Sequence, residues 1–301
     1  MPTDPVHVPV MLEEVLRQLQ PERAGSVLWD LTLGLGGHAR GFLERAGPDA
    51  RLCALDADPS AIERTRARLE PFLARADLVH ASLREVGRVA DERGWPAATA
   101  VLMDLGVSSP QIDEAERGFS YRREGPLDMR FDPTRGATAA ELLCSLPSRE
   151  LAERLEALGD EPLAGEIVKV IKRNLPVETT TRLAELVLEA YGDAPSRVHP
   201  ARRTFQALRI LVNDELGAIE EGLSAAIERL APGGRVAALT YHSGEDRVVK
   251  ALLRERARQG ALRVLTRRPL RPSEAEGMAN QRARSAKLRV AERVAGGGAD
   301  R

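Results

Sequence analysis

A glycine-rich turn and two aspartates are the residues of this chain whose types and spacing first suggest chemistry. Asp30 closes an apolar run and leads into the turn LGLGGH at residues 33–38. Asp56 closes the next apolar run, 20 residues after Gly36. Glycine lets a backbone approach a ligand closely, and an acidic residue at this spacing can accept bonds from both ribose hydroxyls of an adenosine. The pattern therefore predicts a site for a nucleotide-type cofactor.

The segment DLGVSSPQ at residues 104–111 is a second concentration of polar groups, again directly after an apolar run. Its polar side chains are those of Asp104, Ser108, Ser109 and Gln111. A polar turn after a buried strand is the alternative, purely structural interpretation. His242 follows a later apolar run, where it serves either as a cap of that strand or as a polar group of the site.

Strands and helices alternate in the first third of the chain. The patterns predict strands over about 26–33, 51–56, 78–81 and 100–105, and helices over about 37–46, 59–70 and 84–93. This alternation is typical of a doubly wound parallel sheet with helices on both faces. Because the carboxyl ends of parallel strands meet at one edge of the sheet, we expect the glycine turn, Asp56, Asp104 and His242 to face one crevice.

The alternation is interrupted after Gln111. Residues 113–133 are polar and irregular, and residues 134–213 carry only helical patterns. The strand–helix pattern then returns, with a helix over about 214–230 and strands over about 235–242, 262–265 and 286–294. We therefore expect a discontinuous α/β domain of residues 1–112 and 214–301. The segment 113–213 is predicted to be an irregular stretch plus a helical insertion that recognises the substrate.

Composition and charge exclude several classes of protein. The 301 residues are 43% hydrophobic and 30% charged, as in ordinary globular proteins. Cys53 and Cys144 lack the spacing of a metal site, so we expect reduced thiols and no metal. The absence of a leader pattern and of an apolar run near the roughly 18 residues of a membrane span predicts a cytoplasmic protein. The net charge of −1 gives no overall attraction to nucleic acid, but residues 254–293 hold 12 Arg or Lys against 4 Asp or Glu.

Seven sequence blocks are spread over nearly the whole chain. They are HVPV (7–10), LGLGGH (33–38), DLGVSSPQ (104–111), ERGFS (116–120), GPLDMR (125–130), HPARRTFQALRI (199–210) and RARSAKLR (282–289). Together they resemble the small-subunit (16S) ribosomal RNA cytosine N4-methyltransferase family (RsmH/MraW). The resemblance implies the class I fold of methyltransferases that use S-adenosylmethionine (SAM). This is a Rossmann-like doubly wound sheet whose last strand is antiparallel, here with an all-helical insertion after the fourth strand.

The resemblance also implies a set of cofactor residues. These would be Gly36, Gly37, His38, Asp56, Leu83, Asp104 and Gln111. The first three would surround the methionine part of SAM with their backbone, and the fourth would hold the ribose. Leu83 would lie beside the adenine, at a position where many relatives carry Phe. Tyr241 likewise stands where relatives usually carry Phe.

By the same resemblance, the substrate would be the exocyclic N4 of a cytosine in the decoding region of 16S rRNA in the small ribosomal subunit. Methyl transfer from SAM is an in-line displacement in which the protein supplies alignment and desolvation, so no metal is expected. The catalytic residues would be Asp104, Ser108, Ser109 and His242. The carboxylate and the serine backbone would accept the N4 hydrogens, and the histidine would orient the base or accept a proton.

The basic segment, residues 254–293, would bind the RNA. Arg267, Arg268 and Arg271 are predicted to contact phosphates, with a solvated basic face as the alternative. The helical insertion is the second surface expected to contact RNA around an unstacked base. A monomer and a dimer are both compatible with the sequence.

Three other classes of function share parts of the pattern. An oxidoreductase that uses NAD has the same strand–glycine–acid unit, but it leaves the segment 104–111 unexplained. A SAM-dependent methyltransferase acting on another RNA, a protein or a small-molecule amine fits the cofactor site equally well, and only the family resemblance disfavours it. A non-catalytic RNA-binding module would explain the basic segment, yet it has no need of Asp56 and a cofactor crevice.

Overall fold

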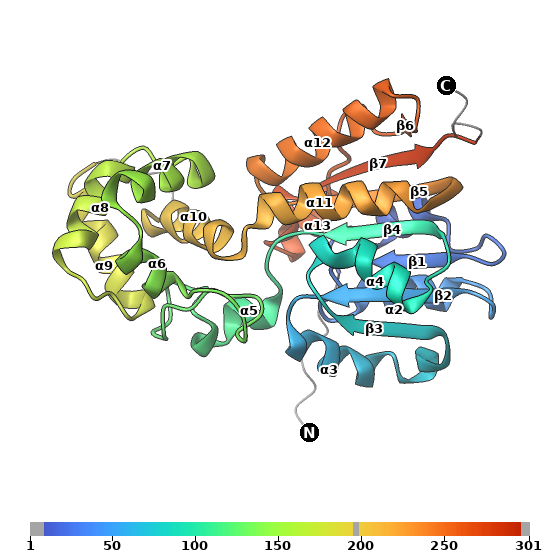
Figure 1. The fold of residues 1–301 in the computed structure, drawn as a ribbon, viewed down its shortest axis with the longest axis horizontal. Coiled ribbons are helices and arrows are strands. Elements are labelled where there is room, and N and C mark those ends of the chain that lie inside the picture. The colour runs from blue at the N-terminus through green and yellow to red at the C-terminus, as the bar shows by residue number, and fades with distance from the viewer. Residues whose placement is uncertain (1–8, 195–198, 296–301) are drawn as a thin grey trace. The chain divides into compact units, whose positions relative to one another are not determined.

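The computed structural model describes residues 9–194 and 199–295, which form two compact units (Figure 1). The first, the α/β unit, contains the described residues up to Gly106 and those from Leu216 onward. The second, the helical unit, contains those from Val107 to Glu215. Residues 7 and 8 of the HVPV block lie outside the described residues. None of the helices described is long and apolar enough to cross a membrane.

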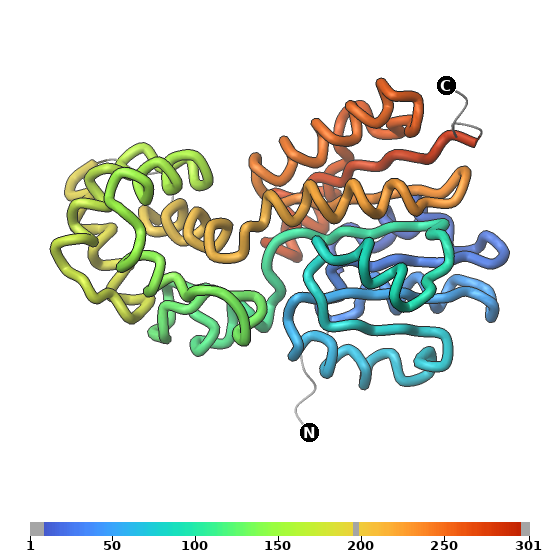
Figure 2. The backbone as a smooth tube through the Cα atoms, in the orientation of Figure 1, coloured from blue at the N-terminus to red at the C-terminus, as the bar shows by residue number. Residues whose placement is uncertain are grey.

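A seven-stranded sheet forms the centre of the α/β unit, and its chain path can be followed in Figure 2. The strands are β1 (Val27–Asp30), β2 (Arg51–Asp56), β3 (Ala76–His80), β4 (Ala98–Asp104), β5 (Leu230–Thr240), β6 (Leu262–Val264) and β7 (Lys287–Arg293). Their order in the sheet is β3-β2-β1-β4-β5-β7-β6. Strands β1 to β5 pair in parallel, whereas β7 is antiparallel to β5 and to β6. The predicted doubly wound sheet with an antiparallel last strand is confirmed.

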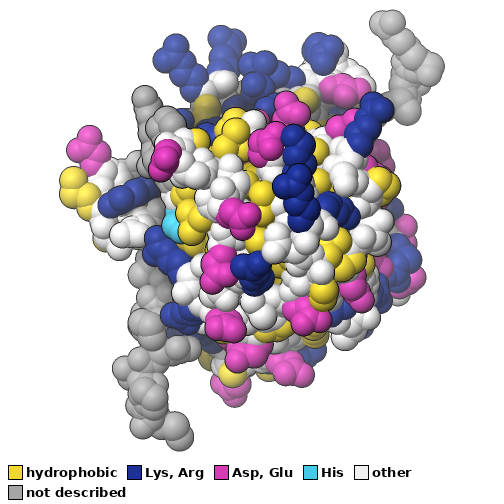
Figure 3. Space-filling model, turned by 90° about the vertical axis from the view of Figure 1, so that its left-hand side faces the viewer, with side chains coloured by type: hydrophobic (Ala, Val, Ile, Leu, Met, Phe, Trp, Pro, Cys, Tyr) yellow, Lys and Arg dark blue, Asp and Glu magenta, His cyan; other side chains and the backbone are white. Residues whose placement is uncertain are grey.

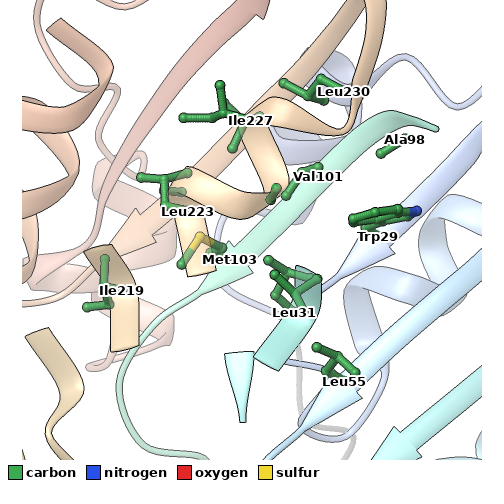
Figure 4. Packing of buried hydrophobic residues seen from close by; sticks show 14 of the residues in the cluster. Trp29, Leu31, Leu55, Ala98, Val101, Met103, Ile219, Leu223, Ile227 and Leu230 are labelled. Atoms are coloured by element: carbon green, nitrogen blue, oxygen red, sulfur yellow. The ribbon is translucent and has the colours of Figure 1, made fainter. Parts of the chain in front are cut away.

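Helices cover both faces of the sheet because its strands are apolar on both sides. The helices are α1 (Leu12–Leu19), α2 (Gly37–Arg45), α3 (Pro59–Arg68), α4 (Val86–Arg93), α11 (Glu215–Glu228), α12 (Ser243–Arg258) and α13 (Glu274–Ala279). Ala100 and Leu102 of β4 join the hydrophobic cluster of α1, α2 and α3, whereas Val101 and Met103 join that of α4, α11 and α12. Figure 4 shows this second face, where Leu223 of α11 lies over β4.

Strand β5 differs from its predicted bounds at both ends. It begins at Leu230, which already pairs with Ala98, and the next pair joins Arg235 to Ala100. Residues 231–234 therefore bulge out of the ladder, and Gly233 adopts a left-handed φ of 70° there. The strand ends at Thr240 because His242 is the N-cap of α12.

The helical unit has a hydrophobic core of its own. Its helices are α5 (Ser109–Asp113), α6 (Ala139–Ser145), α7 (Ser148–Gly159), α8 (Ala164–Arg173), α9 (Thr180–Tyr191) and α10 (Ala201–Asn213). Leu155, Ile167, Leu186 and Leu208 bring α7, α8, α9 and α10 together in one buried cluster. Every described member of this cluster belongs to the helical unit. The two short helices α5 and α13 lie in segments that the sequence patterns leave irregular.

The segment before α6 has an irregular path but tight packing. Arg117 Nη2 donates to the carbonyls of Arg130 (3.0 Å) and Phe131 (2.9 Å). Gly118 adopts φ 75°, and a Cβ at this position would lie 2.4 Å from the carbonyl oxygen of Pro126. The blocks ERGFS and GPLDMR therefore hold one compact loop together, and this loop needs glycine where its two arms cross.

Candidate functional site

Three aspartates lie on one face of the sheet, at the carboxyl ends of neighbouring strands. Asp30 ends β1, Asp56 ends β2 and Asp104 ends β4. Asp30 is in register with Ala54 and Leu102, so the other two aspartates lie two residues further along their strands. Because side chains alternate along a strand, all three carboxylates face the side covered by α1, α2 and α3. Strand β1 is also where the strand order reverses direction, the switch point at which α/β sheets bind ligands.

Asp56 is a carboxylate held in place by backbone N–H groups. Its Oδ2 accepts a bond from Gly34 N (2.7 Å) and its Oδ1 from Asp58 N (2.8 Å). Burial raises the pKa of Asp56 to about 6, although these two backbone bonds lower it. The group is therefore ionised at neutral pH. Each carboxylate oxygen accepts more than one hydrogen bond, so the pair of oxygens suits two adjacent hydroxyl donors.

The glycine turn between β1 and α2 leaves no room for a side chain at Gly36 or Gly37. Gly34 and Gly36 adopt φ values of 52° and 71°, and a Cβ on Gly36 would lie 2.5 Å from Thr65 Cγ2. Thr65 Oγ1 donates to the carbonyl of Gly34 (2.8 Å), which ties α3 to the turn. A Cβ on Gly37 would lie 2.4 Å from Pro9 Cγ. The turn thus presents bare backbone at the first residues of α2, where N–H groups suit an anion.

These features fit SAM. The α2 end of the turn suits the carboxylate of the methionine part, and Asp56 suits the ribose hydroxyls. The negative charges of Asp56 and Asp104 suit the cationic sulfonium and ammonium groups. SAM would therefore be held by Gly36, Gly37, the backbone of His38 and Asp56, as the sequence blocks imply.

Asp30, which leads into the glycine turn, is a member of the carboxylate group that is not among the predicted catalytic or cofactor-binding residues. Its side chain is only 1% exposed, and its Oδ1 accepts a bond from Thr32 N (3.2 Å). Burial, together with the nearby charges of Asp104 and Asp56, raises the pKa of Asp30 to about 8, although the Thr32 backbone bond lowers it. Thr32 Oγ1 in turn accepts from Asp104 N (2.6 Å). The sequence signal for Asp30 is its position at the end of the first apolar run, directly before the glycine turn. Its burial beneath Asp56 and Asp104 is evident only in the structure.

Asp104 is fixed by two side chains from other parts of the α/β unit. Tyr241 donates its hydroxyl to Asp104 Oδ1 at 2.6 Å. Burial, followed by the negative charge of Asp104, holds the pKa of Tyr241 well above its usual value, so this hydroxyl stays a donor. His38 Nδ1 lies 3.6 Å from Asp104 Oδ2, and its Nε2 bonds the carbonyl of Val10 (3.0 Å). The His38 ring therefore braces the end of β4, a role the sequence interpretation did not foresee.

His242 lies at the N-terminus of α12, in a capping box with the fully buried Glu245. Glu245 Oε2 accepts from Tyr241 N (2.7 Å) and from His242 N (3.2 Å). The imidazole Nδ1 accepts from Glu245 N (3.4 Å), and Nε2 lies 3.1 Å from Glu245 Oε1. Nδ1 thus has a hydrogen-bond partner, whereas the buried Nε2 makes no hydrogen bond within the described residues. The catalytic role of His242 stays a prediction.

The remaining predicted residues divide between the two units. Leu83 follows β3 in the α/β unit, and a Cβ on Gly222 of α11 would lie 2.5 Å from its carbonyl oxygen. Ser108, Ser109 and Gln111 belong to the helical unit. There the Gln111 side chain is buried and accepts from Ser108 N (2.9 Å), which caps α5. The α/β unit brings together Gly36, Gly37, His38, Asp56 and Asp104, with Asp30 and Tyr241 added.

Many basic residues near the C-terminus have structural partners. Arg289 Nε, for example, lies 2.6 Å from Asp246 Oδ1, and its side chain is buried. Arg267, Arg268 and Arg271 are exposed instead, and no ion pair joins them to another residue within the described part of the chain. Their predicted contact with phosphate stays a prediction.

Comparisons with known proteins agree over almost the full length of the chain. The model of the MraW methylase family matches residues 4–294. The chain is 47% identical to the ribosomal RNA small subunit methyltransferase H of Thermobifida fusca, over 96% of this chain and 94% of that protein. Proteins of the same name from Nitratidesulfovibrio vulgaris and Thermomicrobium roseum are 46% and 43% identical, covering 96% and 98% of this chain and 95% of their own length.

A solved rRNA methylase from Streptococcus thermophilus aligns with 13% identity and a TM-score of 0.45, over 98% of this chain and 99% of its own. The chain has the class I fold of SAM-dependent methyltransferases, and it belongs to the MraW methylase family.

Proposed function

We propose that this protein transfers the methyl group of SAM to the exocyclic N4 of a cytosine in the decoding region of 16S rRNA, in the cytoplasm. Family membership and the small-subunit methyltransferase name of its relatives support the reaction class and the RNA. The observation that carries the chemistry is the Asp104 carboxylate, which Tyr241 holds at the carboxyl end of β4 beside the glycine turn.

The cofactor would be held by groups that are already in place. Asp56 would accept the ribose hydroxyls, and the backbone at Gly36, Gly37 and His38 would meet the methionine part. Leu83 would pack beside the adenine, and Gln111 would complete the contacts. When bound, SAM supplies a methyl group that is already activated by the sulfonium charge.

The low nucleophilicity of the acceptor nitrogen determines what the protein must supply. The lone pair of a cytosine N4 is delocalised into the ring, so the nitrogen becomes nucleophilic only as it pyramidalises and gains positive charge. A carboxylate that accepts an N4 hydrogen stabilises this charge. Asp104 is suited to this because Tyr241 and His38 fix its orientation before substrate arrives. The Ser108 and Ser109 backbone would add acceptors, and His242 would orient the base or take the proton.

The test is incubation of the purified protein with methyl-labelled SAM and small ribosomal subunits, followed by nuclease digestion and mass spectrometry of the labelled nucleotide. We expect label on N4 of one cytosine of 16S rRNA. Label on C5, on a 2′-hydroxyl or in ribosomal protein would overturn the proposal. Equilibrium binding of SAM and of NAD, compared in parallel, separates the methyltransferase from the oxidoreductase alternative.

A further inference from the structure

Three aromatic rings from two distant parts of the sequence form a pile in the helical unit. Tyr121 stacks on His199 with ring centroids 4.5 Å apart and planes 18° apart. The edge of Tyr121 meets Phe205 of α10, with a centroid distance of 5.6 Å and an angle of 78°. Phe205 is buried, Tyr121 is half-buried and His199 is exposed. The pile therefore begins in the core of the helical unit and ends at solvent on an aromatic ring.

The outermost ring is held in one orientation. His199 Nδ1 accepts a bond from Ala201 N (3.2 Å), and the carbonyl of His199 accepts one from Arg202 N (3.0 Å). Because Nδ1 is an acceptor, the neutral ring carries its proton on Nε2, which makes that nitrogen a donor. A ring with a fixed plane loses little conformational freedom when another flat group stacks on it. This preorganisation suits recognition more than core packing, because an exposed ring adds little to stability.

The surroundings of the pile are basic. Arg122 Cζ lies 5.8 Å from the centroid of the Tyr121 ring, and the Arg122 side chain is exposed. The first turn of α10 carries the exposed Arg202 and Arg203 and no acidic residue, although acids are preferred at that end of a helix. Figure 3 shows one face of the molecule, with a histidine side chain (cyan) at its surface and basic, acidic and hydrophobic side chains interspersed around it. Positive charge beside a flat aromatic surface matches a phosphate chain that carries bases.

We infer that the pile of Tyr121, His199 and Phe205 is a stacking platform for an unpaired base of single-stranded RNA, with Arg122 and Arg202 beside its phosphates. The inference rests on the proposed function. A cytosine whose N4 is to be methylated must leave its stack, and its neighbours then lose a stacking partner. The exposed ring of His199 would replace that partner without reading the base, since every base has a π-face.

A tryptophan placed on the pile tests the stacking directly. In His199→Trp the indole would stack on Tyr121, and a mixed-sequence 12-nucleotide oligoribonucleotide should quench its fluorescence. The natural tryptophans Trp29 and Trp95 lie in the α/β unit, and the wild-type signal corrects for them. An identical response of His199→Trp and of the matched control would overturn the platform.

The matched control is Arg149→Trp, at an exposed position of the same unit. Gly159, at the far end of α7, packs so closely on α10 that a Cβ there would lie 2.6 Å from the Arg203 carbonyl oxygen. Arg149 is ten residues earlier in that helix and therefore about 15 Å away from this contact. The control indole should respond little to the oligoribonucleotide.

Removal of the outer ring gives the second test. His199→Ala should weaken binding of the same oligoribonucleotide by about 5- to 100-fold, the range for loss of one stacked base, and leave binding of a duplex of the same sequence nearly unchanged. Unchanged single-strand affinity in a variant with a wild-type melting temperature would overturn the inference. The two proposals can fail separately. If the wild-type protein methylates N4 but His199→Ala binds single-stranded RNA as well as wild type does, only the stacking platform is refuted. If the label appears on another atom or molecule, only the proposed reaction is refuted.

Discussion

At the scale of single residues, the Asp104 carboxylate is the group on which methyl transfer depends in our proposal. Asp104→Asn keeps an oxygen for the Tyr241 hydroxyl but removes the charge that meets the developing positive nitrogen. We expect single-turnover methylation to fall by about 10²- to 10⁴-fold. Tyr241→Phe removes only the positioning bond and should cost about 2- to 10-fold. Calorimetry of SAM binding to both variants then decides the role of Asp104. If Asp104→Asn binds SAM more weakly but methylates at the wild-type rate once SAM is saturating, Asp104 is a cofactor residue only.

Asp30 predicts an unusual dependence of stability on pH. Its folded pKa of about 8 lies above the unfolded value of about 3.9, so between these values the folded protein binds more protons than the unfolded one. Its contribution to stability is therefore complete below about pH 4 and is lost as the pH rises through about 8. Asp30→Asn should gain stability relative to wild type, by on the order of 2–4 kcal/mol more at pH 8.5 than at pH 5.

The measurement for Asp30 is urea unfolding of both proteins at several pH values. Asp56, with its raised pKa of about 6, titrates in both proteins and so largely cancels in the difference. If the difference in unfolding free energy between Asp30→Asn and wild type is the same at every pH measured, Asp30 is ionised in the folded protein throughout that pH range.

Residues of the site were predictable to the extent that spacing encodes position. The 20-residue interval from Gly36 to Asp56 predicted a glycine turn after one strand and an acidic residue at the end of the next, and both lie there, whereas their binding of SAM stays a prediction. Asp30 and Tyr241 lie at the ends of β1 and β5, yet their importance depends on depth and on a cross-sheet bond to Asp104. Neither the burial of Asp30 nor the hydrogen bond from Tyr241 to Asp104 can be read from the spacing of residues along the chain.

At the scale of elements, the glycine turn predicts a specific steric rescue. Gly36→Ala should reduce SAM affinity at least about tenfold, because the left-handed φ costs an alanine about 1–2 kcal/mol and the new Cβ overlaps Thr65 Cγ2. Thr65→Ser removes that methyl group but keeps the hydroxyl that bonds the Gly34 carbonyl. Affinities of the two single variants and the double variant, measured by calorimetry, should place the double variant between Gly36→Ala and wild type. No recovery in the double variant would exclude the overlap as a cause.

Long periodic elements followed from the sequence, whereas short ones and irregular ends did not. β2 matches its predicted bounds of 51–56, and α2 matches its predicted bounds of 37–46 to within one residue, because an apolar pattern and flanking glycine or proline define them. The helix α5 is only five residues long, too short for an apolar period to indicate it. Ser108 and Gln111 are predicted to be site residues, and the structure shows that they also form the capping box of this helix. The bulge in β5 was hidden because glycine and proline at 232–234 are equally typical of a turn that ends a helix.

At the scale of the whole molecule, the exposed arginines predict how RNA binding responds to salt. Replacing Arg267, Arg268 and Arg271 by Gln should lower the slope of log K against log salt by about 2, since each phosphate contact on a single strand contributes about 0.7. A control with the same charge change replaces three exposed arginines that already have ion-pair partners, Arg88, Arg149 and Arg182. Equal slopes for the two triple variants would assign the effect to net charge and contradict specific contacts.

The separate core of the helical unit has a consequence for how the protein is made. The ribosome completes β4 and then translates residues 107–215 before it reaches β5, which at cellular speeds of about 5–20 residues per second takes roughly 5–20 s. Throughout that interval one edge of β4 has no strand beside it, since among the described strands β4 lies between β1 and β5. The insertion, whose core needs nothing from the sheet, can fold on its own meanwhile. The nascent chain can therefore carry a finished helical unit while the sheet that positions Asp104 is still incomplete.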